Sequence, residues 1–411
     1  MIETERVELS GHVLDDGTLA RILNEIIAQE CAYVIERFDI GKRADDPSSV
    51  RLAITAPSSV PLQQVLNRLQ RYGANLTEPG EPELAVVDVA GSFPEGFYSS
   101  TNLETEVFLQ GEWKRLANPE MDCGIVVANG VPITKPMSDV IEGDMVVVGT
   151  EGVRVKTEPR SINPEETAFE FMNSVVSSEK PQGLQVRNIA EDFRRVKAEG
   201  KKILWVGGPA IVHTGSGPAM VALIEAGYVD VLFAGNALAA HDIESNMFGT
   251  SLGVDLTNAA GVDHGHEHHL RAINRVRRSG SIANAVESGV ITGGIMHGLV
   301  RAEKDFVLVG SVRDDGPLPD VYTDVLEGQR AMRAAIDDVG YSIMVATMLH
   351  AIATGNILPA SVPLVCVDIN PATVTKLSDR GSAQAVGVVT DIGLFMEQLA
   401  DELVPDYRSN D

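Results

Sequence analysis

Cysteine is scarce in this chain of 411 residues, which has only three, far apart at Cys31, Cys123 and Cys366. An odd number of widely separated cysteines suggests neither a disulfide framework nor a CxxC metal site, and it fits a reducing compartment. The sequence also lacks the run of about 18 apolar residues that a membrane-spanning helix requires. Its first residues are acidic and polar, unlike a signal peptide. We therefore expect a cytoplasmic protein.

Basic residues are also in deficit. Lys and Arg number 33 against 58 Asp and Glu, so the net charge is −25. A field of that sign repels nucleic acids and anionic membranes, which argues against both as partners. A solvated acidic surface explains the charge without a specific cationic partner. Hydrophobic residues make up 44% of the chain, an ordinary value for a globular protein, and the length predicts two or three domains.

The pattern of apolar residues divides the chain into three segments. Residues 1–90 read β-α-β-β-α-β, with the last strand at Ala85–Val89, which is the order of a ferredoxin-like α+β unit. Residues 91–185 contain short strands separated by Gly and Pro, which predicts a small β-domain, and Pro181–Val186 reads as a linker. Residues 186–411 carry the chemical motifs.

The third segment alternates between apolar strands and helical patterns. Strands are expected at Ile203–Val206, Val229–Phe233, Phe306–Val309, Ser342–Ala346, Leu364–Asp368 and Ala385–Val389. Helices are expected at Pro218–Ala226, Leu238–Phe248, His268–Gly280, Val321–Asp338, Ala372–Ser378 and Ile392–Leu403. Continuous apolar runs indicate strands buried on both faces, as in a parallel sheet wrapped by helices. Such an α/β domain binds ligands at the carboxyl ends of its strands.

The first loop at this edge is rich in glycine. Gly207 and Gly208 end the first strand, and Thr214, Gly215 and Ser216 precede the next helix. Because glycine lets backbone approach a phosphate and a helix N-terminus favours an anion, these five residues are predicted to bind a cofactor. The spacing matches neither GxGxxG nor a P-loop, and a plain glycine-rich turn is the alternative.

Polar residues at two further strand ends point to a dinucleotide. Asn236 and Ala237 follow the second strand, where Asn236 could contact a nicotinamide or the substrate, or cap the next helix. Asp368 ends the fifth strand, where a carboxylate accepts hydrogen bonds from ribose and disfavours a 2′-phosphate. NAD is therefore expected rather than NADP. Asn370 is placed both for the cofactor and as the cap of the helix that begins at Pro371.

The loop after the third strand carries charges that suit an amino-acid substrate. Asp314 and Asp315 could hold an ammonium group and Arg313 a carboxylate, with a solvated turn as the alternative.

Two more strand ends and one helix supply the remaining candidates. The strand ends contribute cofactor contacts at Ala346, Thr347, Met348, Leu349, Thr390 and Asp391. His350 is a candidate base or a core histidine. Lys376, about one helical turn past Asn370, is a candidate base or a solvated lysine.

Four histidines cluster before one predicted helix, at His264, His266, His268 and His269. The run HGHEHH lacks HExxH spacing and has no cysteine nearby, so no metal is expected. The start of the helix instead places His266 or His269 near the substrate, and His269 is the candidate for binding it.

Several long motifs together resemble one known family. The stretches GGPAIVHTGSG, AGNALAAHDIE, GTSLGVDL, GSVRDDGPLPDV, ATMLHAIATGNILP, VCVDINPATVTKLSDRGSAQAVGVVTDIG, FYSSTNLETEVFLQGEW and MDCGIVV are similar to the lysine-oxoglutarate reductase/saccharopine dehydrogenase conserved-region family. That family includes archaeal-type ornithine cyclodeaminases, and the resemblance covers nearly the whole chain. It implies a C-terminal domain like the NAD-binding domain of deoxyhypusine synthase and sirtuins, in which Asp314 and the strand ends named above contact NAD.

The resemblance implies conversion of L-ornithine to L-proline and ammonia. NAD+ would take hydride from Cα, the δ-amine would close a ring on the imine, ammonia would leave, and the same NADH would reduce the ring. Because neither amine is mainly neutral at pH 7, a base is needed, and Asp315, His350 and Lys376 are the candidates. A homo-oligomer is also implied. The alternatives are an opine- or saccharopine-type dehydrogenase and a sensor of NAD or amino acids.

Overall fold

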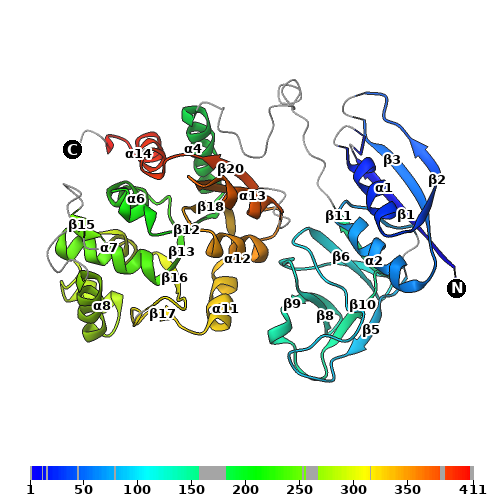
Figure 1. Cartoon of the computed structure of the whole chain (residues 1–411), viewed down its shortest axis with the longest axis horizontal. Coiled ribbons are helices and arrows are strands. Elements are labelled where there is room, and N and C mark those ends of the chain that lie inside the picture. The colour runs from blue at the N-terminus through cyan, green and yellow to red at the C-terminus, as the bar shows by residue number, and fades with distance from the viewer. Residues whose placement is uncertain are drawn as a thin grey trace. The chain divides into compact units, whose positions relative to one another are not determined.

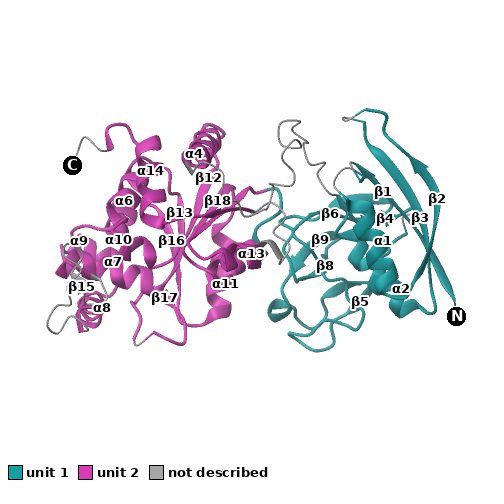
Figure 2. Cartoon of the chain, turned by 45° about the horizontal axis from the view of Figure 1, so that its top comes forward, with its two compact units in different colours: residues 1–168, 356–361 teal, residues 169–355, 362–411 magenta. Residues whose placement is uncertain are grey.

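The computed structural model describes residues 2–11, 13–14, 17–43, 46–77, 80–156, 182–251, 254–255, 267–314, 316–379 and 385–407. The chain divides into two compact units, coloured separately in Figure 2. Unit 1 comprises Met1–Ala168 and Asn356–Ser361, and unit 2 comprises Phe169–Gly355 and Val362–Asp411. The three-segment limits expected from the sequence stay a prediction.

The first sheet of unit 1 buries one face against two helices. Its elements are β1 (Glu3–Gly11), α1 (Thr18–Ala28), β2 (Ala32–Asp39), β3 (Ser48–Ala56), α2 (Ser59–Gln70) and β4 (Asn75–Leu76). The antiparallel strands lie in the order β2-β3-β1-β4, and α1 and α2 pack on them (Figure 1). Leu9 and Leu52 from the strands share one core with Ile22 and Leu66 from the helices. Burial of a single face explains the alternating pattern of the strands.

The fourth strand of this sheet is not the predicted one. β4 is only two residues long and pairs with β1. The predicted strand, Ala85–Val89, overlaps β5 (Glu83–Val86), which pairs with β10 (Met145–Val148) in a different sheet. The prediction was wrong because β4, with only two residues, is too short to show the periodicity of a strand. The apolar run at Ala85–Val89 shows a much clearer strand pattern.

Two small antiparallel sheets complete unit 1, with the orders β5-β10-β8-β9 and β11-β6-β7. The remaining elements are β6 (Glu104–Leu109), β7 (Glu112–Arg115), β8 (Gly124–Ala128), β9 (Val131–Lys135), the 3-10 helix η1 (Met137–Asp139) and β11 (Val153–Lys156). Val107, Ile125 and Val147 come from three of these strands and form part of one buried core.

Unit 2 contains one seven-stranded sheet in which every pair of neighbours is parallel. Its strands are β12 (Lys202–Gly207), β13 (Val231–Gly235), β16 (Asp305–Val309), β17 (Val321–Tyr322), β18 (Val339–Val345), β19 (Leu364–Asp368) and β20 (Ala385–Val389). Consecutive residues such as Leu204 and Trp205 are both fully buried, so the central strands are covered on both faces. The predicted parallel α/β domain is confirmed.

Helices alternate with these strands. They are α4 (Gln182–Ala198), α5 (Ala210–His213), α6 (Gly217–Glu225), α7 (Asn236–Phe248), α8 (His268–Ser279), α9 (Ile282–Glu287), α10 (Ile295–Arg301), α11 (Val325–Ala335), α12 (Leu349–Ile357), α13 (Pro371–Asp379) and α14 (Ile392–Leu403), with a small hairpin of β14 (Thr250–Ser251) and β15 (Val254–Asp255). The helix predicted from Val321 begins later, at Val325, because Asp324 caps it by accepting from the N–H of Leu326 at 2.9 Å.

The predicted linker at Pro181–Val186 is also wrong over most of its length, because α4 begins at Gln182. Gly183 weakens a helix, but four later residues at helical spacing, Val186, Ile189, Phe193 and Val196, are buried. Phe193 packs edge-on against Trp205 and Tyr341, with ring centroids 6.0 and 5.4 Å away. This tertiary burial outweighs the local turn signal.

Candidate functional site

The strand order of unit 2 reverses at one place. From β12 the chain adds β13, β16 and β17 on one side, and it then returns to add β18, β19 and β20 on the other. The loops that leave β12 and β18 therefore run in opposite directions. Open α/β sheets bind ligands outside the carboxyl ends of the strands at such a switch point, so this edge is the candidate site.

Two backbone segments approach closely at the switch point. Gly207 ends β12, and the N–H of Gly208 donates to the carbonyl of Val345 at 2.8 Å. A Cβ atom on Gly208 would lie 1.8 Å from the carbonyl oxygen of Ala346, so only glycine fits. Ala346 itself has φ 53°, a left-handed conformation that is costly for alanine. Strain of this kind concentrates at functional sites.

The loop between α5 and α6 has a structural role of its own. The N–H groups of Thr214, Gly215 and Ser216 donate to carbonyls of residues 210–212, and Gly215 adopts φ 78°. The hydroxyls of Thr214 and Ser216 lie 2.9 Å apart and bond to each other. These contacts close α5 in the manner of a glycine-terminated helix. A phosphate at this loop would have to be bound by groups other than these three amides.

Asn236 joins the ends of two strands. It is buried at the end of β13, and its Oδ1 accepts from the backbone N–H of Leu318, in the loop after β16, at 3.0 Å. The alternative that Asn236 caps α7 is wrong, because it is the first residue of the helix and Gly235 is the cap position. Ala237 follows it in the helix, half-buried. Asn236 therefore fixes the loop that carries the predicted substrate contacts.

The acidic loop after β16 presents a local turn. Asp314 is half-buried, and its Oδ2 accepts from the N–H of Ser311 at 2.6 Å. Arg313 is exposed and extends no described contact to a neighbouring acid. Asp315 lies outside the described residues. Asp314 is thus held in the turn, whereas Arg313 faces solvent.

His350 lies beside the last residues of β13 and β16. A Cβ atom on Gly235 would lie 3.4 Å from its Cε1, and the ring bonds to the backbone of Val309. Burial lowers the pKa of His350, against the opposing effects of the Val309 hydrogen bond and the charge of Asp314. The imidazole is consequently neutral at pH 7. His350 is therefore close enough to Asp314 to interact with its charge.

The other residues that follow β18 spread along the same edge. Thr347 lies beside Gly208, with 3.3 Å between its Cβ and the position of a Cβ on the glycine. Lys376, exposed on α13, places its Nζ 3.8 Å from the Sδ of Met348. Leu349 is 78% exposed. Lys376 is therefore exposed and contacts the loop that follows β18, and its role as a base stays a prediction.

The ends of β19 and β20 use their polar side chains to shape turns. Asp368 is buried and its Oδ1 accepts from the N–H of Asn370 at 2.8 Å. Asn370 in turn accepts from the N–H of Ala372 at 3.0 Å, the capping contact expected for it. The N–H of Thr390 donates to the carbonyl of Asp368 at 3.3 Å. Asp391 caps α14 by accepting from the N–H of Leu394 at 2.9 Å.

A buried polar cluster, of which the sequence analysis named only His268 and His269, lies on α5, α7, β14 and α8. Glu244 is fully buried, with one carboxylate oxygen 3.0 Å from His241 Nδ1 and the other 3.0 Å from Thr250 Oγ1. Thr250 also bonds to His268 Nδ1 at 2.8 Å. The rings of His213 and His269 lie 5.0 and 6.3 Å from that of His241. The only signal in the sequence was the recurrence of histidine near strand ends.

Comparison with known proteins matches nearly the whole length of the chain. Residues 187–399 match the Rossmann-fold C-terminal domain of arginine dihydrolase ArgZ-like proteins, residues 104–186 match the first region of the same C-terminal part, and residues 4–103 match the LOR/SDH bifunctional enzyme conserved region. The ornithine cyclodeaminase of Methanothermobacter thermautotrophicus is 50% identical over 98% of this chain and 98% of its own length. The chain belongs to this ornithine cyclodeaminase family. The resemblance read from the motifs is confirmed, and the family is one of enzymes.

Two solved structures of the family are similar to this chain. The apo structure of ArgZ, a cyanobacterial arginine dihydrolase, superposes with a TM-score of 0.86 at 36% identity, covering 98% of this chain and 58% of that one. AgrE in a ternary complex with ornithine and NAD+ superposes with a TM-score of 0.53 at 39% identity, covering 98% of this chain and 57% of that one. This chain therefore corresponds to a little over half of each of these bifunctional relatives.

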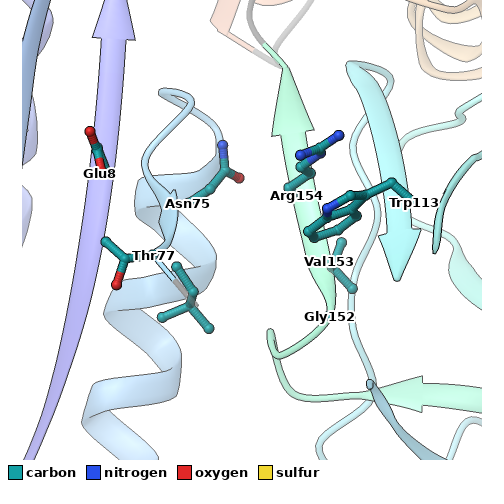
Figure 3. Close-up of a pocket in the computed structure, with 8 residues that line it drawn as sticks. Glu8, Asn75, Thr77, Trp113, Gly152, Val153 and Arg154 are labelled. Carbon is teal, nitrogen blue, oxygen red and sulfur yellow. The ribbon is translucent and has the colours of Figure 1, made fainter. Parts of the chain in front are cut away.

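A cavity of about 270 Å³ lies in unit 1, remote in sequence from the residues above. In Figure 3, Trp113 and Arg154 stand on one side of it, facing Glu8, Asn75 and Thr77. The guanidinium of Arg154 lies 4.0 Å from the centre of the Trp113 ring, a cation–π contact. None of its lining residues is a predicted site residue.

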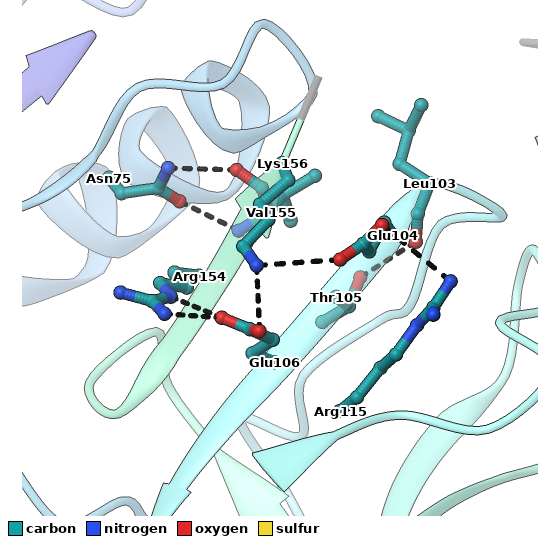
Figure 4. Close-up of polar contacts among 9 residues, drawn as sticks. All are labelled: Asn75, Leu103, Glu104, Thr105, Glu106, Arg115, Arg154, Val155 and Lys156. Atoms are coloured by element: carbon teal, nitrogen blue, oxygen red, sulfur yellow. Dashed lines mark hydrogen bonds and ion pairs between the residues drawn. The ribbon is translucent and has the colours of Figure 1, made fainter. Parts of the chain in front are cut away.

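Ion pairs beside this cavity stabilise the small sheets (Figure 4). Glu106 pairs with Arg154 at 2.5 Å and with Lys156 at 2.7 Å, and Lys156 also reaches Glu104 at 3.4 Å. Burial raises the pKa of Glu106, but the hydrogen bonds and charges of these two cations outweigh it and hold the pKa below its ordinary value. Asn75 binds β11 through the N–H and the carbonyl of Val155, each at 2.8 Å. These contacts join β4 to β11.

Within the described ranges, no three His, Cys, Asp or Glu side chains are grouped so as to hold a metal ion. His264 and His266 lie outside the described residues. In the same ranges, every helix is too short or too polar to cross a bilayer.

Proposed function

We propose that this protein is an NAD-dependent ornithine cyclodeaminase that converts L-ornithine to L-proline and ammonia. The observation that carries the proposal is the switch point between β12 and β18, where Gly208 and the strained Ala346 meet. Support comes from the name of the archaeal relative at 50% identity and from the ornithine and NAD+ in the AgrE complex.

The residues at this edge fit a dinucleotide. Gly207 and Gly208 leave backbone without side chains at the end of β12, and Asp368 supplies a carboxylate that favours ribose hydroxyls over a 2′-phosphate. The proposed cofactor contacts are Gly207, Gly208, Thr214, Gly215, Ser216, Asn236, Ala237, Asp314, Ala346, Thr347, Met348, Leu349, Asp368, Asn370, Thr390 and Asp391. When bound, NAD supplies a nicotinamide ring that accepts and returns an electron pair.

The chain's own residues orient the substrate and move its protons. The ornithine cation becomes the proline zwitterion and one ammonium ion, so neither oxidation state nor total charge changes overall. Both amines of ornithine are protonated at neutral pH, and each must lose a proton before its nitrogen can react. We assign this role at one amine to His350, whose neutral imidazole can accept a proton.

Substrate contacts are assigned to the loop after β16 and to α8. Asp314 and Arg313 would hold the ammonium and carboxylate groups, and His269 would line the substrate. His350 is preferred as base because it is neutral and lies near Asp314, whereas Lys376 is exposed. The roles of Lys376 and Asp315 as alternative bases stay predictions.

The test is to incubate the purified protein with NAD and L-ornithine and to quantify proline and ammonia. One proline and one ammonia should appear per ornithine, without net change in NADH absorbance. Steady accumulation of NADH would favour the opine- or saccharopine-type dehydrogenase. Tight binding of amino acids without product would favour the sensor. Full turnover by rigorously NAD-free protein would rule out the scheme.

Three further properties belong to this proposal. The C-terminal domain is proposed to be related to deoxyhypusine synthase and sirtuins, the N-terminal sheet to be ferredoxin-like, and residues 91–185 to be a small β-domain with its linker. The protein is proposed to be a cytoplasmic homo-oligomer. Light scattering, measured as the protein elutes from a size-exclusion column, would test the oligomeric state.

A further inference from the structure

Glu244 is a buried carboxylate with a hydrogen-bond partner on each oxygen. Thr250 Oγ1 donates to Oε1 at 3.0 Å, and His241 Nδ1 lies 3.0 Å from Oε2. A hydroxyl has one proton, so Thr250 accepts in its 2.8 Å contact with His268 Nδ1. The carboxylate likewise accepts from His241, which places the proton of a neutral His241 on Nδ1 and leaves Nε2 as an acceptor. This is the arrangement of a carboxylate-oriented imidazole base.

We propose that His241 and Glu244 form a second proton-transfer group for the substrate, with His241 as the catalytic residue and Glu244 as its positioning residue. The inference rests on the proposed conversion of ornithine. That reaction has two ammonium groups to deprotonate, and His350 serves only one. His241 Nε2 accepts a proton from one substrate amine and returns it to the ammonia or the ring nitrogen later.

The position of the dyad fits this role. α7 begins at Asn236, at the end of β13, and His241 lies five residues further, roughly 7.5 Å along the helix axis. His213 ends α5, the short helix that follows β12. α7 and α8 lie side by side, as Figures 1 and 2 show. The imidazoles of His213, His241 and His269 therefore come from elements that surround one end of the sheet.

The surroundings of His241 suit an imidazole that exchanges one proton. Among the residues that the structure describes, the titratable groups in contact with it are Glu244 on its own helix, His213 on α5 and His269 on α8. Burial lowers the pKa of His213, the positive charge of His241 lowers it further, and Glu244 opposes both. A charged His241 therefore disfavours a second positive charge on His213, whose ring lies 5.0 Å away.

The decisive variants are His241→Ala, His241→Gln and Glu244→Gln, with His297→Gln on α10 as the matched control. Both His241 variants should lower kcat by about 100-fold or more, the usual contribution of a general base, with NAD affinity and Tm close to those of the parent. Added imidazole should restore part of the turnover of His241→Ala, because its cavity admits the missing ring. Glu244→Gln should lower kcat while leaving KM close to that of the parent, because it removes the carboxylate that orients the His241 ring.

A spectroscopic measurement separates the dyad from the proposed reaction. In ¹⁵N-labelled protein without substrate, the Nδ1–H proton of His241 should resonate downfield, and Glu244→Gln should abolish that signal. If the parent enzyme makes no proline, the reaction proposal fails while this signal can still be observed. If the parent turns over, the dyad is overturned by a His241→Gln variant with unchanged kcat. It is equally overturned by a His241→Ala variant that imidazole does not rescue.

Discussion

Gly208 and Ala346 approach so closely that a Cβ atom on the glycine would lie 1.8 Å from the carbonyl oxygen of the alanine. That oxygen belongs to backbone and cannot rotate away, so the two loops must separate if any side chain is added. Gly208→Ala should therefore weaken NAD binding by at least about tenfold and lower Tm. Fluorescence titration with NADH and thermal unfolding would measure both effects.

Gly217→Ala is the matched control for that substitution. A Cβ atom on Gly217, the first residue of α6, would meet nothing within 4 Å. The variant should bind NAD as the parent does and should be as stable or slightly more so, because alanine favours helix. If Gly208→Ala and Gly217→Ala had equal effects on NAD binding and Tm, the close approach of Gly208 to Ala346 would not explain them.

Asn236 holds the Leu318 loop through one hydrogen bond of 3.0 Å. Asn236→Ala leaves the buried N–H of Leu318 without its partner, which should cost about 1–3 kcal/mol of unfolding free energy and lower kcat through the displaced Asp314 loop. Asn236→Asp keeps an acceptor oxygen and should retain slow hydrogen exchange at the Leu318 amide. Fast exchange in Asn236→Asp as well would contradict this assignment.

Asp242 is fully buried and accepts from the N–H groups of Ile295 and Met296 at 2.7 and 2.8 Å, at the start of α10. Burial raises its pKa to about 6, against these two hydrogen bonds. The folded state then binds more protons than the unfolded state between about pH 4 and 6, so this group's contribution falls as pH rises through that window. The stability of the parent minus that of Asp242→Asn should drop by up to about 3 kcal/mol from pH 4 to 7 in denaturant unfolding.

Asp230→Asn is a control for Asp242→Asn, because the pKa of Asp230 is shifted in the opposite direction. Burial raises its pKa, but hydrogen bonds from Lys304, the N–H of Ile203 and Lys197 outweigh this and hold the pKa below its ordinary value. Its contribution is present above the unfolded pKa and is lost as pH falls through the folded pKa. The parent minus Asp230→Asn difference should therefore rise with pH, and the same slope for both variants would refute the assignment of either shift.

His350 should determine the acidic limb of the pH profile of kcat/KM. Burial lowers its pKa, so the acidic limb of kcat/KM should fall below the ordinary histidine value of about 6.5. His350→Gln should remove this limb and lower kcat by about 100-fold. Asp314→Asn removes a charge that opposes the lowering and should move the limb further down in pH. A limb that stays in place in both variants would assign the base elsewhere.

The sequence by itself determined the class of the second domain. Its strands are buried on both faces, so their apolar runs are continuous, and Ile203–Val206 and Leu364–Asp368 were placed within a residue or two of β12 and β19. Glycines and polar residues at strand ends also pointed to one edge of the sheet, because the carboxyl ends of parallel strands lie together. Family membership was readable from long motifs in the same loops.

Tertiary structure decided what no local pattern carries. β4 is a strand only because β1 offers it a free edge, and α4 is a helix because its apolar face packs on Trp205. The contacts of Asn236 with Leu318 and of Glu244 with Thr250 and His241 depend on where α7 lands after β13. Periodicity reports which face of one element is buried, whereas a site is made by side chains that different elements bring to the same place.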